Sequence, residues 1–541
     1  MAMHEQDDPQ RVSRRPPWAR VLLFLAGMGA AVLLLNLVPY DRAADMPPVS
    51  LPPERIASLA DLPPLPQPGE IRLLFVGASL TAGYPYQPGD RVGYPDLVGE
   101  TLTFLLPERK VVWRTLAVPA LDSPRLVELG RMALAYRPRA LLFCVGANEF
   151  SNRLFYGRHL LPAGPLARVA DHFSRARVLV RRLHRWLDPP DRASSLVTQD
   201  RIREKILTGA PGRPAIGGLP VSIADREYLI ARMEENMARI HRHCAAAGVP
   251  LLFLASPDNL GGAWPWAVVD RPEPAGLAAT VARCRAGKGS PAEVERLLDL
   301  APGRADLHFM RGLLRQGDGQ FAAAREDFLR AATLDQAPMR ATPRIRAALR
   351  RRAAALGRPC IELDAGLVTP ASGEIPDPAF FLDHAHITMA GQARVALHLV
   401  GALAEAGRLP PLPAGWRERA RTHLAGYLEG RIDPAVRGAA QAVMLWSRGN
   451  YFLLFGNYRD ALPVYIRAFG YGRPEARKAD LDLAGSLIFC AFKLAGKLTL
   501  ADEEGGPSRG ERFARAYAEL CRARRENRLA EKVSELARPE E

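Results

Sequence analysis

Ile71-Arg-Leu-Leu-Phe-Val-Gly-Ala-Ser-Leu-Thr-Ala-Gly-Tyr84 is the stretch that decides the fold. Five of the six residues from Ile71 to Val76 are apolar, and a glycine ends the run. This pattern is typical of a strand that is buried on both faces of a parallel sheet. Ser79 then lies at the carboxyl end of the strand, which is where open α/β sheets bind ligands. Taken alone, the stretch also fits a strand-turn-helix unit whose serine has no chemical role.

Two later stretches bring further polar residues into the argument. Arg139-Ala-Leu-Leu-Phe-Cys-Val-Gly-Ala-Asn-Glu-Phe150 is a second buried-strand pattern, and it delivers Asn148 to the same edge of the sheet. Phe381-Leu-Asp-His-Ala-His-Ile-Thr-Met-Ala-Gly391 places Asp383 and His386 three residues apart, just before an apolar helical pattern. A serine, a histidine and an aspartate are the residue types of a nucleophile, its base and the partner that orients the base.

Together, the strand-end serine, the strand-end asparagine and the late Asp-x-x-His resemble the SGNH (GDSL-like) hydrolase superfamily. Gly77-Ala-Ser-Leu80 stands where that family has Gly-Asp-Ser-Leu, so the resemblance makes Ser79 the nucleophile. Asp383-His-Ala-His386 stands on the family's Asp-x-x-His, which makes His386 the base and Asp383 its orienting partner. The resemblance reaches most of the way from residue 70 to about 405.

The resemblance also implies three hydrogen-bond donors to the oxyanion. They are the backbone N–H of Ser79, the backbone N–H of Ala120 and the side-chain amide of Asn148. The family's Asn-x-Gly-x-x-Gly aligns only loosely with Thr115–Ala120, where alanine replaces both glycines. Because the donor there is a backbone group, Ala120 can still serve. Glu149-Phe150, in place of the family's Asp, resembles a bacterial branch whose members also contain tetratricopeptide repeats.

Alternating strand and helix patterns predict the fold class. The expected strands are 71–76, 110–116, 140–145, 250–255 and 359–363. Helical patterns lie between them, notably at 94–106, 123–136 and 224–247. Such alternation predicts a parallel sheet with helices on both faces. The resemblance implies, more narrowly, a three-layer α/β/α domain with a five-stranded, flavodoxin-like sheet.

Length and charge set further limits. The 541 residues exceed what one core holds, so two or three units are expected. The net charge of +15 is compatible with nucleic acid binding, but only seven of the 73 basic residues are lysine, and the arginines are spread over the whole chain. Since no RNP, zinc-finger or helix-turn-helix motif is present, we expect no nucleic acid partner. The six cysteines show no Cys-x-x-Cys spacing, so no disulfide pairing is predicted.

The amino terminus predicts a membrane anchor. Residues 21–40 contain no charge and are long enough to cross a bilayer. Arginines in the preceding basic tail, 1–20, favour a cytoplasmic amino terminus. The catalytic domain would then lie in the periplasm or outside the cell, lifted from the membrane by the proline-rich linker 41–69. A cleaved signal peptide, ending near Arg42, is the alternative.

A repeat interrupts the hydrolase pattern. Small and aromatic residues recur with a shift of 137 residues: Gly312, Gly319, Ala324, Phe328 and Ala331, then Gly449, Gly456, Ala461, Tyr465 and Ala468. The pattern resembles the tetratricopeptide repeat, which implies helical hairpins and a protein partner. The predicted organisation is therefore a hydrolase domain at 70–290 and 337–405, a repeat-like insert at 291–336, and a helical carboxyl-terminal domain at 406–541.

Several alternatives stay open at this stage. His384 could replace His386 as the base, and Asp383, His384 and His386 could instead bind a metal, although we expect neither a metal nor a cofactor. The leading hypothesis is a membrane-anchored serine esterase that removes acetyl or longer acyl groups from a glycan, lipid or other envelope substrate. An O-acyltransferase with the same triad and a non-catalytic repeat scaffold are the alternatives. The segment 151–223 is the candidate for setting substrate choice.

Overall fold

The computed structural model describes residues 61–86, 91–150, 223–265, 290–430 and 434–454, together with a few single positions. The predicted transmembrane helix at 21–40, most of the segment 151–223 and most of the second repeat copy lie outside the described residues. Among the residues that are described, no helix is both long enough and apolar enough to span a bilayer.

The centre of the fold is a five-stranded parallel sheet. The strands are β1 (Ile71–Gly77), β2 (Val111–Ala117), β3 (Ala140–Val145), β4 (Leu251–Ala255) and β5 (Cys360–Glu362). They are ordered β2-β1-β3-β4-β5, and each neighbouring pair is parallel. This is the flavodoxin-like order, so the predicted sheet is confirmed. Every residue of β1, β3 and β4 is buried, as continuous apolar runs require.

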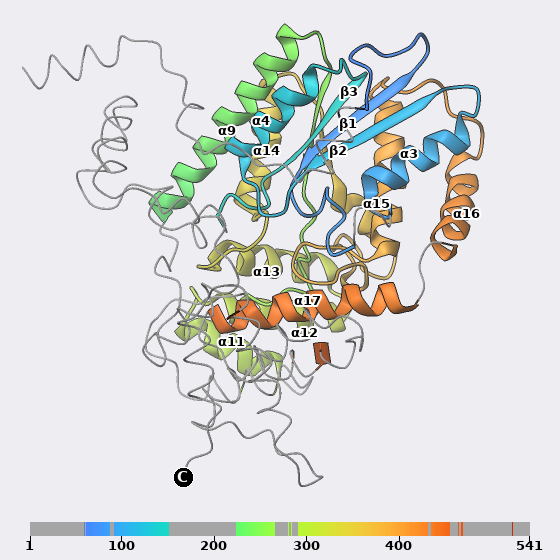
Figure 1. Cartoon of the computed structure of the whole chain (residues 1–541). Helices are drawn as coiled ribbons and strands as arrows, with labels where there is room; N and C mark the ends of the chain where they lie inside the picture. Colours follow the sequence, from blue (N-terminus) through green and yellow to red (C-terminus); the bar gives the residue numbers. More distant parts are fainter. Residues whose placement is uncertain are drawn as a thin grey trace, which may run out of the picture. The chain divides into compact units, whose positions relative to one another are not determined.

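Helices cover both faces of the sheet (Figure 1). One layer contains α3 (Tyr94–Leu105) and α15 (Met389–Glu405), which pack against each other. The other contains α4 (Ser123–Leu134), α9 (Ile223–Ala246) and α14 (Pro343–Ala355), with α9 in contact with both neighbours. The predicted three-layer arrangement is therefore confirmed.

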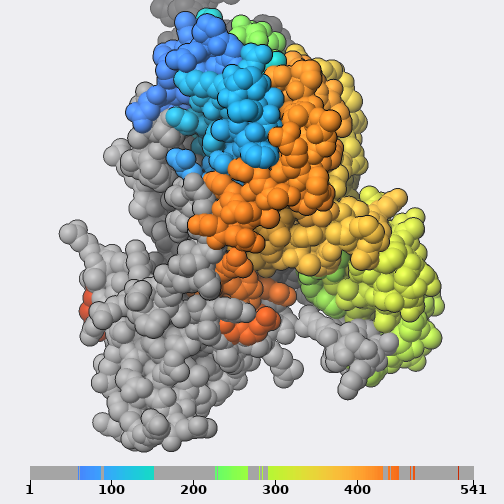
Figure 2. Space-filling model, turned by 90° about the vertical axis from the view of Figure 1, so that its right-hand side faces the viewer, coloured from blue at the N-terminus to red at the C-terminus, as the bar shows by residue number. Residues whose placement is uncertain are grey.

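Beyond α15, the described residues form two further helices, α16 and α17. α16 (Trp416–Glu429) packs on α3 and α15, and buries Ala420 and Leu424 in the same apolar cluster as Phe75. In Figure 2, the late part of the chain, in orange, lies against the early part, in blue. α17 (Pro434–Leu454) follows, and its Ala440 is buried beside Tyr86. Part of the segment predicted as a carboxyl-terminal domain thus completes the core beside α3.

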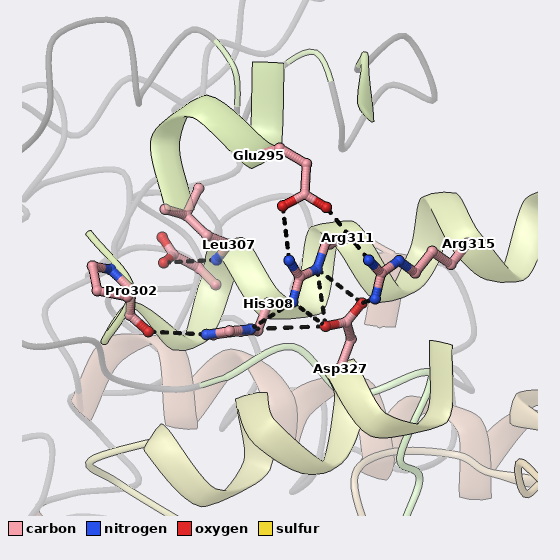
Figure 3. Close-up of polar contacts among 8 residues, drawn as sticks. Glu295, Pro302, Leu307, His308, Arg311, Arg315 and Asp327 are labelled. Carbon is pink, nitrogen blue, oxygen red and sulfur yellow. Dashed lines mark hydrogen bonds and ion pairs between the residues drawn. The ribbon is translucent and has the colours of Figure 1, made fainter. Parts of the chain in front are cut away.

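The predicted insert forms three helices, α11 (Pro291–Leu300), α12 (Ala305–Gly317) and α13 (Phe321–Leu334). α12 and α13 approach closely because Gly312 lacks a side chain: a Cβ there would lie 2.6 Å from Cε1 of Phe328. Asp327, 4% exposed, accepts hydrogen bonds from Arg311 and Arg315 (Figure 3). The helical hairpin is observed, whereas its membership of the tetratricopeptide family stays a prediction.

Candidate active site

The end of β1 places Ser79 at the carboxyl edge of the sheet. The chain turns tightly after the strand, with Ala82 N–H donating to Ala78 O at 2.9 Å and Tyr84 N–H donating to Ser79 O at 3.0 Å. Gly77 is needed for this turn, because a Cβ at that position would overlap the Thr81 side chain. The motif that singles out Ser79 therefore also explains how the serine is presented.

The Asp-x-x-His segment folds into a tight loop ahead of α15. Asp383 Oδ1 accepts from the backbone N–H of Ala385 at 2.8 Å and of His386 at 2.6 Å. Leu382 N–H donates to His386 O at 2.8 Å, and the Thr388 hydroxyl caps α15. One carboxylate oxygen of Asp383 thus fixes its own loop, and the other oxygen remains available to the histidine ring.

Ser79, His386 and Asp383 form a continuous hydrogen-bonded chain. His386 Nε2 lies 2.8 Å from Ser79 Oγ, and His386 Nδ1 lies 2.8 Å from Asp383 Oδ2. Burial by itself raises the pKa of Asp383, but the charges of His386 and His384 and several hydrogen bonds outweigh it and lower the pKa below its usual range. The aspartate is therefore an anion at neutral pH, as an orienting partner must be.

His384 also lies close to the aspartate. Its Nδ1 is 3.7 Å from Asp383 Oδ2, and the bond to Ser79 comes from His386. Burial, helped by the charges of His386 and Arg340, lowers the pKa of His384 to about 4. The geometry therefore favours His386 over His384 as the base. Among the described residues, no group of three or more His, Cys, Asp or Glu side chains is arranged to hold a metal ion.

The three expected oxyanion donors border the cavity beside Ser79. Ala120 has a φ of 63°, a left-handed conformation in which glycine is usual and which costs an alanine about 1 kcal/mol. This backbone geometry fits the glycine of the loosely aligned family block. Asn148 Nδ2 donates to Leu121 O at 3.0 Å, which fixes the plane of the amide.

The cavity beside Ser79 has a volume of about 210 Å³. Apolar side chains, including Leu126 and Met339, contribute much of its wall. Tyr84 and Ser447 also line it, and their hydroxyl oxygens lie 3.2 Å apart. The Tyr84 ring packs beside that of His386, with 5.0 Å between ring centroids. Because Ser447 belongs to α17, the segment after the hydrolase motif supplies part of the wall.

Sequence reasoning missed the residues that hold the triad loop. Asn259 Nδ2 donates to Asp383 O at 2.7 Å, and Asn259 N–H donates to His384 O at 3.0 Å. The neighbouring Asp258 forms a buried ion pair with Arg340, at 3.1 Å. One signal was present in the sequence, since Asn259 follows β4 at the same sheet edge as Ser79.

No family model and no curated protein matches this chain. Solved structures do match. A Bacteroides fragilis protein provisionally assigned as an acylhydrolase is 12% identical, with a TM-score of 0.30, covering 68% of this chain and 99% of its own. A GDSL-like lipase from Bacteroides thetaiotaomicron is 11% identical, with a TM-score of 0.30, and the match covers 65% of this chain and 97% of the lipase. A lipase/acylhydrolase from Enterococcus faecalis is 12% identical, with a TM-score of 0.27, and the match covers 63% of this chain and 99% of that protein.

TM-scores this low describe a loose overlap of the folds. The sheet has the order β2-β1-β3-β4-β5. The hydrogen-bonded serine, histidine and aspartate lie at the carboxyl edge of that sheet. The fold and this arrangement agree with what the resemblance to the SGNH (GDSL-like) hydrolase superfamily implies.

Proposed function

We propose that this protein is a serine esterase that hydrolyses carboxylic esters through an acyl-serine intermediate. The observation that carries the proposal is the pair of 2.8 Å contacts that link Ser79 Oγ to His386 and His386 to Asp383. A serine hydroxyl is a weak nucleophile at neutral pH and needs a base within hydrogen-bonding distance. His386 meets that requirement, and Asp383 selects the tautomer in which Nε2 is the proton acceptor.

In the proposed mechanism, His386 removes the Ser79 proton as Oγ attacks the ester carbonyl. The backbone N–H groups of Ser79 and Ala120 and the amide of Asn148 receive the charge that develops on the carbonyl oxygen. Protonated His386 then gives its proton to the departing alcohol, which leaves an acyl-serine. A water molecule, activated by the same histidine, attacks the acyl carbon and restores Ser79 with release of the carboxylic acid.

The cavity supports a short acyl group as the moiety that binds beside Ser79. Its volume of about 210 Å³ is smaller than the roughly 300–1,000 Å³ of pockets that hold drug-sized ligands. The side chains of Leu126 and Met339 provide an apolar surface for a few methylene groups. The alcohol part of the ester, a glycan or lipid in our proposal, and the membrane anchor are extensions of the sequence hypothesis.

The test is hydrolysis of p-nitrophenyl esters of increasing chain length by the purified full-length chain and by Ser79→Ala. Loss of the nucleophile should lower kcat by about 10³-fold or more, while circular dichroism and melting temperature stay unchanged. Acetate and butyrate should be better substrates than decanoate. Equal rates in the two folded proteins would refute the acyl-serine mechanism. In the same assay with a sugar added as acceptor, recovery of an acylated sugar rather than free acid would identify a transferase.

A further inference from the structure

Glu149 is a buried carboxylate for which the mechanism above has no role. It directly follows Asn148 and is fully buried. Its Oε1 accepts from the backbone N–H of Ser123 at 2.8 Å, and its Oε2 lies 2.9 Å from Ser123 Oγ. The two bonds join the loop after β3 to the first residue of α4.

Ser123 begins α4 three residues after Ala120, directly beyond the loop that carries the expected backbone donor. The residue before it, Asp122, occupies the N-cap of α4 but makes no side-chain capping bond. Its carboxylate instead pairs with Arg125 at 2.8 Å and Arg232 at 2.9 Å. Glu149 therefore binds a backbone N–H at the start of the helix, where the helix dipole favours a negative charge.

A second bond joins the same two loops. Asn148 Nδ2 donates to Leu121 O at 3.0 Å, one residue beyond Ala120. The Asn148 loop is thus tied to the Ala120 loop on both sides of the peptide that links Asn148 to Glu149. Ala120 needs such support, since its left-handed backbone is unfavourable for an alanine.

We propose that Glu149 is a positioning residue for the oxyanion hole: by binding Ser123 it holds the loops of Asn148 and Ala120 at a fixed separation. The inference rests on the proposed esterase function and deepens it. Without Glu149, the backbone N–H of Ser123 at the start of α4 loses its acceptor. The distance between the oxyanion donors of Asn148 and Ala120 is then no longer fixed. Since donors must lie about 3 Å from the developing oxyanion, a small displacement reduces the rate without abolishing substrate binding.

The charges around Glu149 explain why we expect a glutamine at this position to preserve its hydrogen bonds to Ser123. Burial, then repulsion from Asp122, raises the pKa of Glu149 to about 7, with Arg232 and Ser123 opposing the rise. Arg125 also pairs with Asp122 here, and Asn236 Nδ2 donates to Ser123 Oγ at 3.2 Å. A protonated glutamate can donate to Ser123 Oγ and still accept from Ser123 N–H, because a hydroxyl donates or accepts. Glutamine reproduces that pattern.

The experiment compares Glu149→Ala, Glu149→Gln and the matched control Asp327→Ala with the wild-type chain. Asp327 is also a buried carboxylate that accepts hydrogen bonds from Arg311 and Arg315, but it lies in the helical insert (Figure 3). We measure kcat and KM for p-nitrophenyl acetate and the rate at which a fluorophosphonate labels Ser79. Glu149→Ala should lower kcat and labelling by about 10²-fold, as loss of one oxyanion donor does, and leave KM within about threefold.

Glu149→Gln should restore kcat to within about threefold of wild type, and Asp327→Ala should lower only the melting temperature. If Glu149→Ala does not fold, Ser123→Ala takes its place, with an expected tenfold or greater loss of kcat in the folded protein. Unchanged kcat and labelling in folded Glu149→Ala, or in Ser123→Ala in its place, overturn the inference about Glu149 and leave the proposed esterase function standing. So does an equal loss of kcat in Asp327→Ala. A wild-type chain that neither hydrolyses nor reacts overturns the proposed function as well.

Discussion

Asp383→Asn should disable the base by reversing the tautomer of His386. In the native site, Oδ1 accepts two backbone N–H bonds, from Ala385 and His386, while Oδ2 accepts the ring Nδ1–H. An asparagine oxygen must stay where the backbone donors are, because the Nδ2 group cannot accept. The amide nitrogen then faces Nδ1 of His386, so the ring proton moves to Nε2, opposite Ser79. A ring with Nε2–H cannot take the serine proton.

The size of the effect follows from the alternatives open to the asparagine. Turning the amide to face His386 with its oxygen would leave two backbone N–H groups opposite an NH₂ group. Each buried donor without an acceptor costs about 1–3 kcal/mol, so the turned amide is about 2–6 kcal/mol less favourable. The wrong tautomer therefore dominates. In serine proteases, the same aspartate-to-asparagine change in the triad lowers kcat by about 10⁴, which equals roughly 5.5 kcal/mol in the barrier.

The assay is kcat for p-nitrophenyl acetate across pH 5–9, with the melting temperature as a test of folding. Asp383→Asn should lose about 10³- to 10⁴-fold in kcat near pH 7, with a smaller change in KM. Asp327→Asn, which also neutralises a buried carboxylate, serves as the control and should keep wild-type kcat. A folded Asp383→Asn that retains more than a tenth of wild-type kcat would refute the tautomer argument.

Three further outcomes follow from the structure. Gly312→Leu should lower the free energy of unfolding by about 1–3 kcal/mol in a denaturant titration, because its side chain collides with Phe328, while kcat of the folded fraction stays unchanged. Ser447→Phe should narrow the cavity and raise KM for the butyrate ester more than for the acetate ester; equal changes would contradict the placement of Ser447 in the acyl wall. The lowered pKa of His384 means that its neutral form is favoured by folding, so this contribution to stability is present above pH 6.5 and is lost as the pH falls towards 4. His384→Asn should therefore flatten the melting-temperature profile over that interval, and a profile as steep as wild type would show that other groups cause the acid sensitivity.

The sheet could be predicted from the sequence alone. The central strands β1, β3 and β4 are short, largely apolar runs that end at glycine or just before a glycine or serine, and every residue in them is buried, as such runs require. The expected strands agree with the observed ones to within about one residue at each end. Local motifs pointed to Ser79, Asp383 and His386, and local contacts within 381–391 are what aim the aspartate and histidine at each other.

The distant groups that support the site depend on the three-dimensional fold. Glu149 meets Ser123 across 26 residues, Asn259 meets Asp383 across 124, and Tyr84 meets Ser447 across 363. None of these pairs shares a motif or a periodicity, because each depends on how strands are ordered and how helices pack on them. Short-range patterns in the sequence therefore point to the groups that we propose to react. Their supporting contacts require only proximity in space, which a linear pattern does not encode.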